Sequence, residues 1–434
     1  MRAESNYIKY RGIAAALRAK ILSGEFKPGT RLPTREALIR QFDTTSVTIQ
    51  KAFDLLADQG WIRAAGRRGT FVSEKLPNRC YALAFPWPRQ IDTSQFYRAL
   101  WQQAEQLTTP QRQITCFYEI GSRTDTEDYL RLADLVRSHR LAGVIFANNP
   151  FDVEGLPVLE EPGVARVTII APKAPLPVPF VGPDVAAFCG KALDVLAAAG
   201  RRRVAVITLA QVEESGPWLA KLFEMAAARG LQIQRAWVQA APLMAPQWAR
   251  HAAEVLFQAG TTARPDALLI TDDNLVPEAT AGVRAAGVRV PEDVRAIVHT
   301  NFPYPTPAAV PVTRVGFDIS HLLELCIERI DQQCRGEQPP MHTVLPPLSE
   351  AEYRQRGAES NEARAQVSAL ETSHQSRDRS SNSHDGDGGR RLAVRCTAFT
   401  RSGPLQAGPL QTGPLQAGPP KGGTPNSFPT SFRP

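Results

Sequence analysis

The middle of the chain alternates short apolar runs with segments of helical period, and this alternation restricts the possible folds most strongly. The apolar runs predict β-strands at Tyr81–Phe85, Ile114–Tyr118, Gly143–Ala147, Val164–Ala171, Val204–Leu209, Ala267–Thr271 and Val294–Val298. Helices are predicted between them at Gln95–Leu107, Thr126–His139, Val185–Ala199, Trp218–Ala228, Gln247–Gln258 and Leu275–Ala286. Strands that alternate with helices of this length predict doubly wound parallel α/β sheets. We expect two such lobes, with any ligand bound beyond the carboxyl ends of the strands.

The basic charge of the chain is concentrated at its N-terminal end. Residues 1–79 contain 15 Lys and Arg against seven Asp and Glu, a net charge of +8, whereas the whole chain has a net charge of only +7. The remaining residues therefore carry a net charge of −1. This asymmetry indicates a head that binds a polyanion, attached to a nearly neutral body.

Composition excludes several other classes of protein. A hydrophobic fraction of 43% is enough for a substantial core. No apolar run approaches the roughly 18 residues of a membrane span, and residues 1–10 lack the apolar region of a signal peptide. The six cysteines are scattered without a Cys-x-x-Cys pair, which is typical of reduced thiols in a cytoplasmic protein. We therefore expect a cytoplasmic protein without a metal site and with no membrane partner.

Three helices and a hairpin are predicted in the basic head. Helical period runs from Tyr7 to Ser23, and a turn-rich link follows at Phe26–Pro33. Thr34 is suited to cap a short second helix, and Thr45 is suited to cap a third. The third helix carries an apolar stripe at Ile49, Ala52, Phe53 and Leu56 that must face the core.

The opposite side of this third helix is polar. Ser46, Gln50 and Lys51 then point away from the core, with Thr45 and Thr48 in the first turn. Short polar groups at the front of an exposed helix can reach base edges and phosphates in a major groove. The plain alternative is a solvated helix face, which is common.

A basic hairpin is expected to follow the third helix. Trp61–Arg63 and Thr70–Val72 are predicted as two short strands around a turn that contains Arg67, Arg68 and Gly69. The two arginines can contact phosphate or a minor groove, although an Arg-Arg turn can also be merely a surface turn. The order of helices and hairpin in a segment of charge +8 favours a DNA-binding head.

The head resembles the winged helix–turn–helix of GntR-type regulators. The resemblance rests on Phe26–Glu36, Thr48–Phe53 and Gly69–Val72 and covers about residues 7–73. It implies binding of double-stranded DNA through the following residues: Arg35, Thr45, Ser46, Thr48, Gln50, Lys51, Arg67, Arg68, Gly69 and Thr70. Such heads usually have Arg where this chain has Glu36 and Ser46, and often at Gln50. Gln50 can pair with adenine, whereas Arg favours guanine, so an altered operator sequence is expected.

The body is similar to LacI/GalR-type effector domains, which are related to periplasmic sugar-binding proteins. The resemblance rests on Asp184 with Gly200–Val204, on Asp273 with Val290–Asp293, and on Val312–Val315 before a helix at Ser320–Cys334. It covers roughly residues 80–350. It implies two lobes that close on a small ligand and transmit closure to the DNA-binding head.

Six residues are candidates for contact with that ligand. The resemblance places the carboxylates of Asp184 and Asp273 at strand ends, and Phe85 and Trp87 follow the first strand of the body. Trp218 occupies the position of a sugar-binding Arg, and Thr300-Asn301 stands where the family tends to have Asp. A sugar is the default ligand by analogy, but the loss of both charges indicates a changed ligand or a pocket without one. The two aspartates can equally be helix N-caps, and the aromatic residues can pack a lobe or a dimer interface.

The C-terminal end has the composition of a disordered tail. After about Tyr353 the periodicity is lost, and Gly-Pro-Leu-Gln recurs at 403–406, 408–411 and 413–416. Proline in every five-residue unit fits neither a helix nor a sheet. The predicted domains are therefore a winged helix–turn–helix at 1–75, a two-lobed effector-binding and dimerisation domain at 76–350, and a disordered tail at 351–434.

Enzyme motifs are missing from the sequence. It contains no Gly-x-Ser-x-Gly, no His-Glu-x-x-His, no P-loop and no Gly-x-Gly-x-x-Gly. No cofactor is expected. We therefore predict a homodimeric, sequence-specific transcription regulator, a repressor by expectation, whose operator affinity depends on a sugar-like effector. The alternatives are a ligand-blind architectural or adaptor protein and, less favoured, a regulator fused to a pyridoxal phosphate enzyme.

Overall fold

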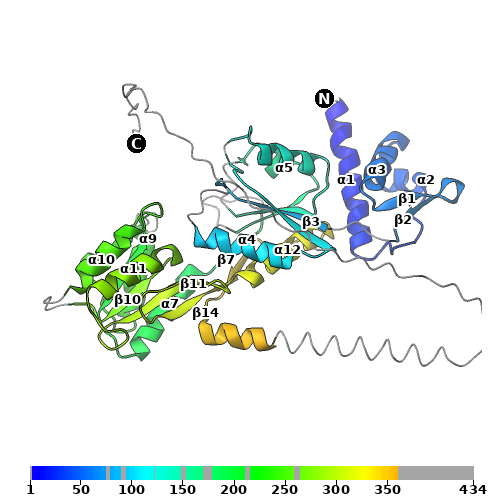
Figure 1. The fold of residues 1–434 in the computed structure, drawn as a ribbon. Coiled ribbons are helices and arrows are strands. Elements are labelled where there is room, and N and C mark those ends of the chain that lie inside the picture. The colour runs from blue at the N-terminus through cyan, green and yellow to red at the C-terminus, as the bar shows by residue number, and fades with distance from the viewer. Residues whose placement is uncertain are drawn as a thin grey trace, which may run out of the picture. The chain divides into compact units, whose positions relative to one another are not determined.

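The computed structural model describes most of the chain up to residue 359 (Figure 1). The described ranges are 2–74, 79–88, 94–121, 123–147, 153–169, 178–210, 216–258 and 264–359. Contacts group Met1–Gln366 into one compact unit. A helical stretch at 350–359 extends past the expected start of the tail at residue 351, and the rest of the tail lies outside the described residues. No described helix is both long and apolar enough to cross a membrane.

The head has the predicted order of elements. Its helices are α1 (Arg2–Leu22), α2 (Arg35–Gln41) and α3 (Ser46–Asp58), and its strands are β1 (Ile62–Ala64) and β2 (Thr70–Val72). Thr34 and Thr45 cap α2 and α3 through their hydroxyl groups, as predicted. The predicted apolar stripe of α3 packs against Leu17 and Leu38 in a separate small core.

The first lobe is a six-stranded sheet in which every recorded strand pair is parallel. Its strand order is β13 (His342–Leu345), β7 (Phe180–Pro183), β6 (Ala165–Thr168), β5 (Gly143–Phe146), β3 (Arg79–Ala84) and β4 (Arg112–Phe117). α5 (Glu127–Arg137) and α6 (Pro157–Glu160) pack on one face. α4 (Gln95–Leu107) and α12 (Ile319–Cys334) pack on the other.

The second lobe repeats this architecture. Its strand order is β14 (Leu348–Ser349), β12 (Thr313–Asp318), β11 (Arg295–Phe302), β10 (Ala267–Ile270), β8 (Val204–Leu209) and β9 (Val238–Ala241). Only β14 is antiparallel to its neighbour among these pairs. α10 (Gln247–Phe257) and α11 (Val276–Ala285) cover one face, and α7 (Val185–Ala198) and α9 (Gly216–Ala227) cover the other. Doubly wound parallel α/β lobes are therefore confirmed.

The chain crosses between the lobes more than once. α7 follows β7 of the first lobe and packs on the sheet of the second, whereas α12 follows β12 of the second lobe and packs on the first. The apolar runs did not indicate β7, β9, β12, β13 or β14, because polar residues, glycine or proline interrupt the apolar stretches of these strands. β6 is shorter than the run that predicted it.

Candidate functional site

The N-terminal turn of α3 presents a polar surface to solvent. Ser46 and Lys51 are exposed, and the Thr45 hydroxyl accepts the Thr48 N–H at 3.3 Å. Val47, which the sequence analysis did not select, is 62% exposed on the same turn. The sequence signal for Val47 is its place between two hydroxyl residues in the first turn of α3, where an exposed apolar side chain would be able to contact a thymine methyl group.

Two predicted DNA-contacting residues of α3 have partners within the head. Thr48 is 3% exposed, and its hydroxyl lies 2.9 Å from that of Thr45. The Gln50 amide donates to Asp54 Oδ1 at 2.5 Å. Thr48 therefore orders the first turn of α3, and Gln50 must leave Asp54 before it can read a base.

The hairpin after α3 is a short wing with an arginine-bearing tip. β1 and β2 pair antiparallel, with Ile62 opposite Val72. Arg67 and Arg68 lie in a 3₁₀ turn, η1 (Gly66–Arg68), and both are exposed. Gly69 has a φ of +102°, and a Cβ there would lie 2.7 Å from Nε of Arg31. Arg31, absent from the sequence-based candidates, therefore lies close to the wing and adds an exposed positive charge.

The other predicted DNA contacts lie near this surface. The Arg35 guanidinium is exposed at the start of α2, with its Cζ 5.9 Å from the centre of the Phe53 ring. Thr70 opens β2 and is half-buried. The cationic groups thus come from α2, α3 and the wing, and the fold of the head orients them.

The body contains a cavity of about 560 Å³ that residues of both lobes line. Aromatic and aliphatic side chains form most of its wall, and polar residues form one end. The lining residues are Trp87, Ser94, Phe96, Tyr97, Pro183, Val185, Phe188, Leu209, Trp218, Leu243, Thr271, Asp272, Asp273, Asn274, His299, Asn301, Phe317, Ile319, Leu322 and Leu345. An apolar cleft with a few polar groups at strand ends is typical of a small-molecule site.

The polar end of the cavity is built from the carboxyl ends of β10 and β11. Two residues separate the end of β10 from Asp273, which begins η4 (Asp273–Leu275) and whose Oδ2 accepts the Asn301 amide at 2.7 Å. Both residues are 1% exposed. His299 Nδ1 lies 3.9 Å from Asp273 Oδ1 and is buried without a hydrogen-bond partner. This end therefore offers an amide, a carboxyl and an imidazole to a ligand.

Burial sets the protonation of these groups. It raises the pKa of the Asp273 carboxyl to about 8, and the neighbouring Asp272 carboxylate adds to the rise. Burial also lowers the pKa of His299 and raises the pKa of Tyr97 to about 12. Near neutral pH these three groups are therefore mainly uncharged hydrogen-bonding groups.

The structure places four of the six effector-site candidates on the cavity wall: Trp87, Trp218, Asp273 and Asn301. Asp184 instead accepts the Ala187 N–H at 2.9 Å as the N-cap of α7. Phe85 is 3% exposed and stacks on Tyr118, with ring centres 5.3 Å apart. Neither Asp184 nor Phe85 is among the residues that line the cavity. No group of His, Cys, Asp and Glu in the described part of the chain could hold a metal ion.

Comparison with known proteins identifies both parts of the chain. Residues 9–72 match the family described as bacterial regulatory proteins of the gntR family, and residues 193–355 match the periplasmic binding protein-like domain. Both descriptions concern regulatory or binding domains rather than enzymes, in agreement with the sequence-based expectation.

Two repressors match a short part of this chain, and the matched stretch is only a part of each repressor. The mannosyl-D-glycerate transport/metabolism system repressor MngR of Escherichia coli K12 is 39% identical over 69 residues, which are 16% of this chain and 29% of the relative. The arabinose metabolism transcriptional repressor of Geobacillus stearothermophilus is 31% identical over 74 residues, 17% of this chain and 20% of the relative. The chain thus matches less than a third of the length of these relatives.

Solved structures of LacI-family regulators resemble the body. A regulatory protein from Chloroflexus aggregans aligns with a TM-score of 0.49 and 21% identity, over 62% of this chain and 96% of that one. A regulator from Lactobacillus casei with bound glucose aligns with a TM-score of 0.47 and 18% identity, over 62% and 98%. The family matches thus show a gntR-family region at residues 9–72 joined to a periplasmic-binding-protein-like domain at residues 193–355.

Proposed function

We propose that this protein is a DNA-binding transcription regulator, a repressor by analogy with its relatives, whose operator affinity depends on a small molecule in the cavity between the lobes. The observation that carries the proposal is the presence of an exposed, basic winged helix–turn–helix and a two-lobed ligand cavity in one compact unit. A chain that can bind both DNA and a ligand can link the two equilibria, because each ligand then changes the affinity for the other by the same factor.

The head supplies both kinds of DNA contact. Ser46, Val47 and, once released from Asp54, Gln50 face the base edges, where Gln50 favours adenine and Val47 favours a thymine methyl. Phosphate contacts come from the positive groups around them and from the wing backbone; these are Arg31, Arg35, Lys51, Arg67, Arg68, Gly69 and Thr70. Such contacts set register and salt dependence, whereas the α3 residues set sequence preference.

A homodimer fits this mode of binding. One head covers only a few base pairs, and a second head related by a two-fold axis doubles the contact and selects a palindromic operator. A DNA-binding head needs access to DNA, so we place the protein in the cytoplasm. The spacing of the two heads is then the quantity that a ligand in the body can change.

The cavity chemistry supports an uncharged, sugar-like ligand. Among the described lining residues there is no Lys or Arg, and the acidic groups are Asp272 and Asp273. An anionic ligand would therefore meet no compensating positive charge on these walls, and its desolvation would be unfavourable. The rings of Trp87 and Trp218 suit the apolar face of a sugar ring, while Asn301 and Asp273 suit its hydroxyl groups. The ligand-blind alternative predicts that no such compound binds.

Salt-dependent DNA binding tests the proposal directly. Fragments selected from a random DNA library with the full chain would supply an operator, and its Kd would then be measured from 50 to 300 mM salt. We expect Arg67→Ala and Arg68→Ala each to weaken binding at all sequences and to lower the salt slope by about one unit per lost phosphate contact.

Lys221→Ala is the matched control, because Lys221 is an exposed cation on α9 of the second lobe. It should change neither the Kd nor the slope. An unchanged slope in both wing variants would remove the wing from the DNA interface, and failure to select any DNA would overturn the regulator proposal.

A further inference from the structure

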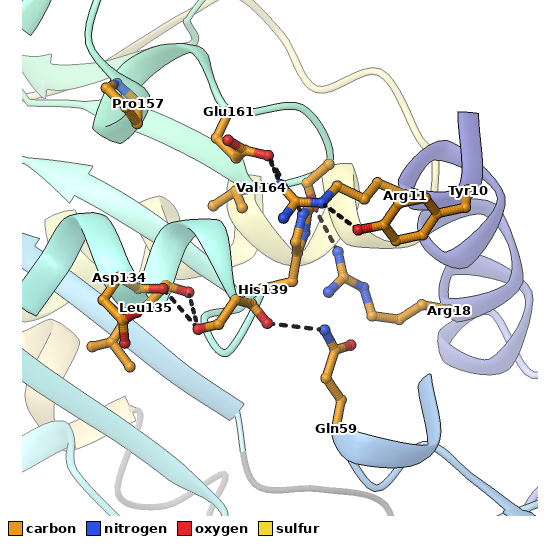
Figure 2. Close-up of polar contacts among 12 residues, drawn as sticks. Tyr10, Arg11, Arg18, Gln59, Asp134, Leu135, His139, Pro157, Glu161 and Val164 are labelled. Carbon is orange, nitrogen blue, oxygen red and sulfur yellow. Dashed lines mark hydrogen bonds and ion pairs between the residues drawn. The ribbon is translucent and has the colours of Figure 1, made fainter. Parts of the chain in front are cut away.

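Helix α1 of the head is seated on the first lobe through two buried arginines (Figure 2). Arg18 is 7% exposed, and its Nη2 donates to the Gly163 carbonyl at 2.7 Å. Arg11 is 8% exposed and forms an ion pair with Glu161. A guanidinium removed from water is costly unless it is paired, and both partners come from the loop between α6 and β6. The burial of these arginines therefore depends on contact with the lobe.

A second polar contact joins the head to the first lobe. Gln59, directly after α3, donates from Nε2 to the Ser138 carbonyl at 3.2 Å (Figure 2). The adjacent His139 is 4% exposed and lies close to Glu161, Arg11 and Arg18. Burial lowers the pKa of His139 to about 4, and the two arginines add to this fall. A neutral imidazole thus fills the space between the buried cations without adding a charge.

The C-terminal end of α12 also lies against α1. A Cβ built on Gly336 would lie 3.8 Å from the Ala19 Cβ of α1. Cys334, Arg18 and Leu22 line one cavity of about 300 Å³ between the head and the lobe. The first turn of α12, with Ile319 and Leu322, lines the ligand cavity. One helix of 16 residues, about 24 Å long, therefore reaches from the ligand cavity to α1.

Among the described residues, the docked head keeps its proposed DNA-contacting side chains exposed. Ser46 and Lys51 on α3 and Arg67 and Arg68 on the wing are all exposed, while the docked residues lie on α1 and just after α3. Docking and DNA binding thus use different surfaces of the head. Undocking is not needed to expose the residues that would touch DNA.

We infer that the head binds DNA while docked, so that the head and the first lobe move as one body. The inference rests on the proposed DNA-binding function and adds its mechanical basis. A ligand that shifts the first turn of α12 then reorients a rigid head through lobe movement. A ligand effect on a head that hung from a flexible linker would have no such path.

A disulfide that joins α1 to the turn after α12 tests the inference. The distance of 3.8 Å at Ala19 and Gly336 is the usual Cβ–Cβ separation of a disulfide. We expect the full chain with Ala19→Cys and Gly336→Cys to form this bond nearly completely under mild oxidation. We also expect the oxidised protein to bind its selected operator with a Kd within about threefold of the reduced form. Each single cysteine variant controls for bonds to native cysteines.

Results that contradict the inference differ from results that contradict the proposed function. If the bond does not form in the folded protein, the head is not docked in solution and the inference is overturned. A bond that forms but weakens operator binding more than tenfold would show that docking inhibits the head, which also overturns it. Loss of operator binding in both redox states would instead contradict the proposed function.

A charge exchange provides a second test that does not need the Gly336 substitution to fold well. Glu161→Arg should increase amide hydrogen exchange in residues 9–22 at least tenfold, and adding Arg11→Glu should reverse most of the increase, because the exchanged pair restores the contact. Glu74→Arg is the control, since Glu74 forms an exposed ion pair with Arg63 within the head. Equal exchange in all variants would overturn the docked state.

Discussion

Individual residues in this protein have roles that depend on how deeply they are buried. Asp184 and Asp273 both follow strands in the sequence, yet Asp184 caps α7 whereas Asp273 is 1% exposed and faces the ligand cavity. A cap carboxylate is stabilised by backbone N–H groups, and a buried carboxyl is penalised when it ionises. The same residue type thus caps a helix at one site and lines the cavity between the lobes at the other.

Asp273 should make the stability of the free protein depend on pH. Its pKa is raised to about 8 in the folded chain, against about 4 in an unfolded chain. The folded state therefore holds the proton more tightly, and stability falls as the pH rises from about 4 towards 8. We expect Asp273→Asn to flatten this decline, so that its melting temperature exceeds that of the parent by more at pH 8 than at pH 5.

Thermal unfolding of both proteins between pH 5 and 8 would measure this difference. Asp293→Asn is a suitable control, because the exposed Arg289 pair lowers the pKa of Asp293 and leaves it ionised over that range. A constant difference between parent and Asp273→Asn at all pH values would show that Asp273 does not titrate in this interval.

At the scale of elements, close packing of neighbouring strands decides which residues are tolerated. β12 lies beside β11 in the second lobe, with Gly316 opposite Thr300. A Cβ on Gly316 would lie 1.7 Å from the Thr300 carbonyl oxygen, which belongs to the backbone and cannot rotate away. The glycine is thus required by the approach of two strands rather than by a turn.

Gly316→Ala should therefore destabilise the body strongly. We expect a loss of about 3 kcal/mol or more in the free energy of unfolding, because the strands must separate to admit the methyl group. Urea denaturation would measure it. Gly12→Ala on α1 is the control, since nothing lies within 4 Å of its added Cβ and alanine favours a helix; a similar loss in both variants would refute the packing argument.

At the scale of the whole molecule, the proposed function depends on a ligand bound between the lobes. The cavity takes residues from both sheets, and the Gln95 N–H donates to the Asn274 side chain across the lobes at 2.8 Å. A ligand there contacts both lobes at once and favours one of their arrangements. In the inferred mechanism, that arrangement sets the position of the head through α12 and its contacts with α1.

A panel of neutral sugars with their phosphorylated counterparts would identify the ligand class. We expect at least one neutral sugar to raise the melting temperature as its concentration rises and to change the operator Kd, while its phosphate ester has no effect. Trp218→Ala should remove the response, and Trp248→Ala, an exposed residue outside this cavity, should keep it. No response to any neutral sugar would favour the ligand-blind alternative, and a response to the phosphate alone would contradict an uncharged ligand.

Much of the fold could be predicted because local signals were strong. The apolar runs at β3, β5, β8 and β10, the helical periods between them and the capping threonines of the head depend only on neighbouring residues, and all were found. The edge strands β9, β13 and β14 were missed because polar residues interrupt their short apolar stretches. Likewise, the basic residues of α3 and the wing follow from their spacing, but the burial of Thr48 depends on how α3 packs.

The sequence by itself determined the order of elements, the basic charge of the head and the alternation that builds two parallel lobes, because these depend on near neighbours along the chain. The tertiary structure alone decided which residues meet from a distance. It brought Asp273 to Asn301, placed Arg11 beside Glu161 and ran α12 from the ligand cavity to α1. Contacts between residues tens to hundreds of positions apart arise from packing, and residue spacing along the chain does not encode them locally.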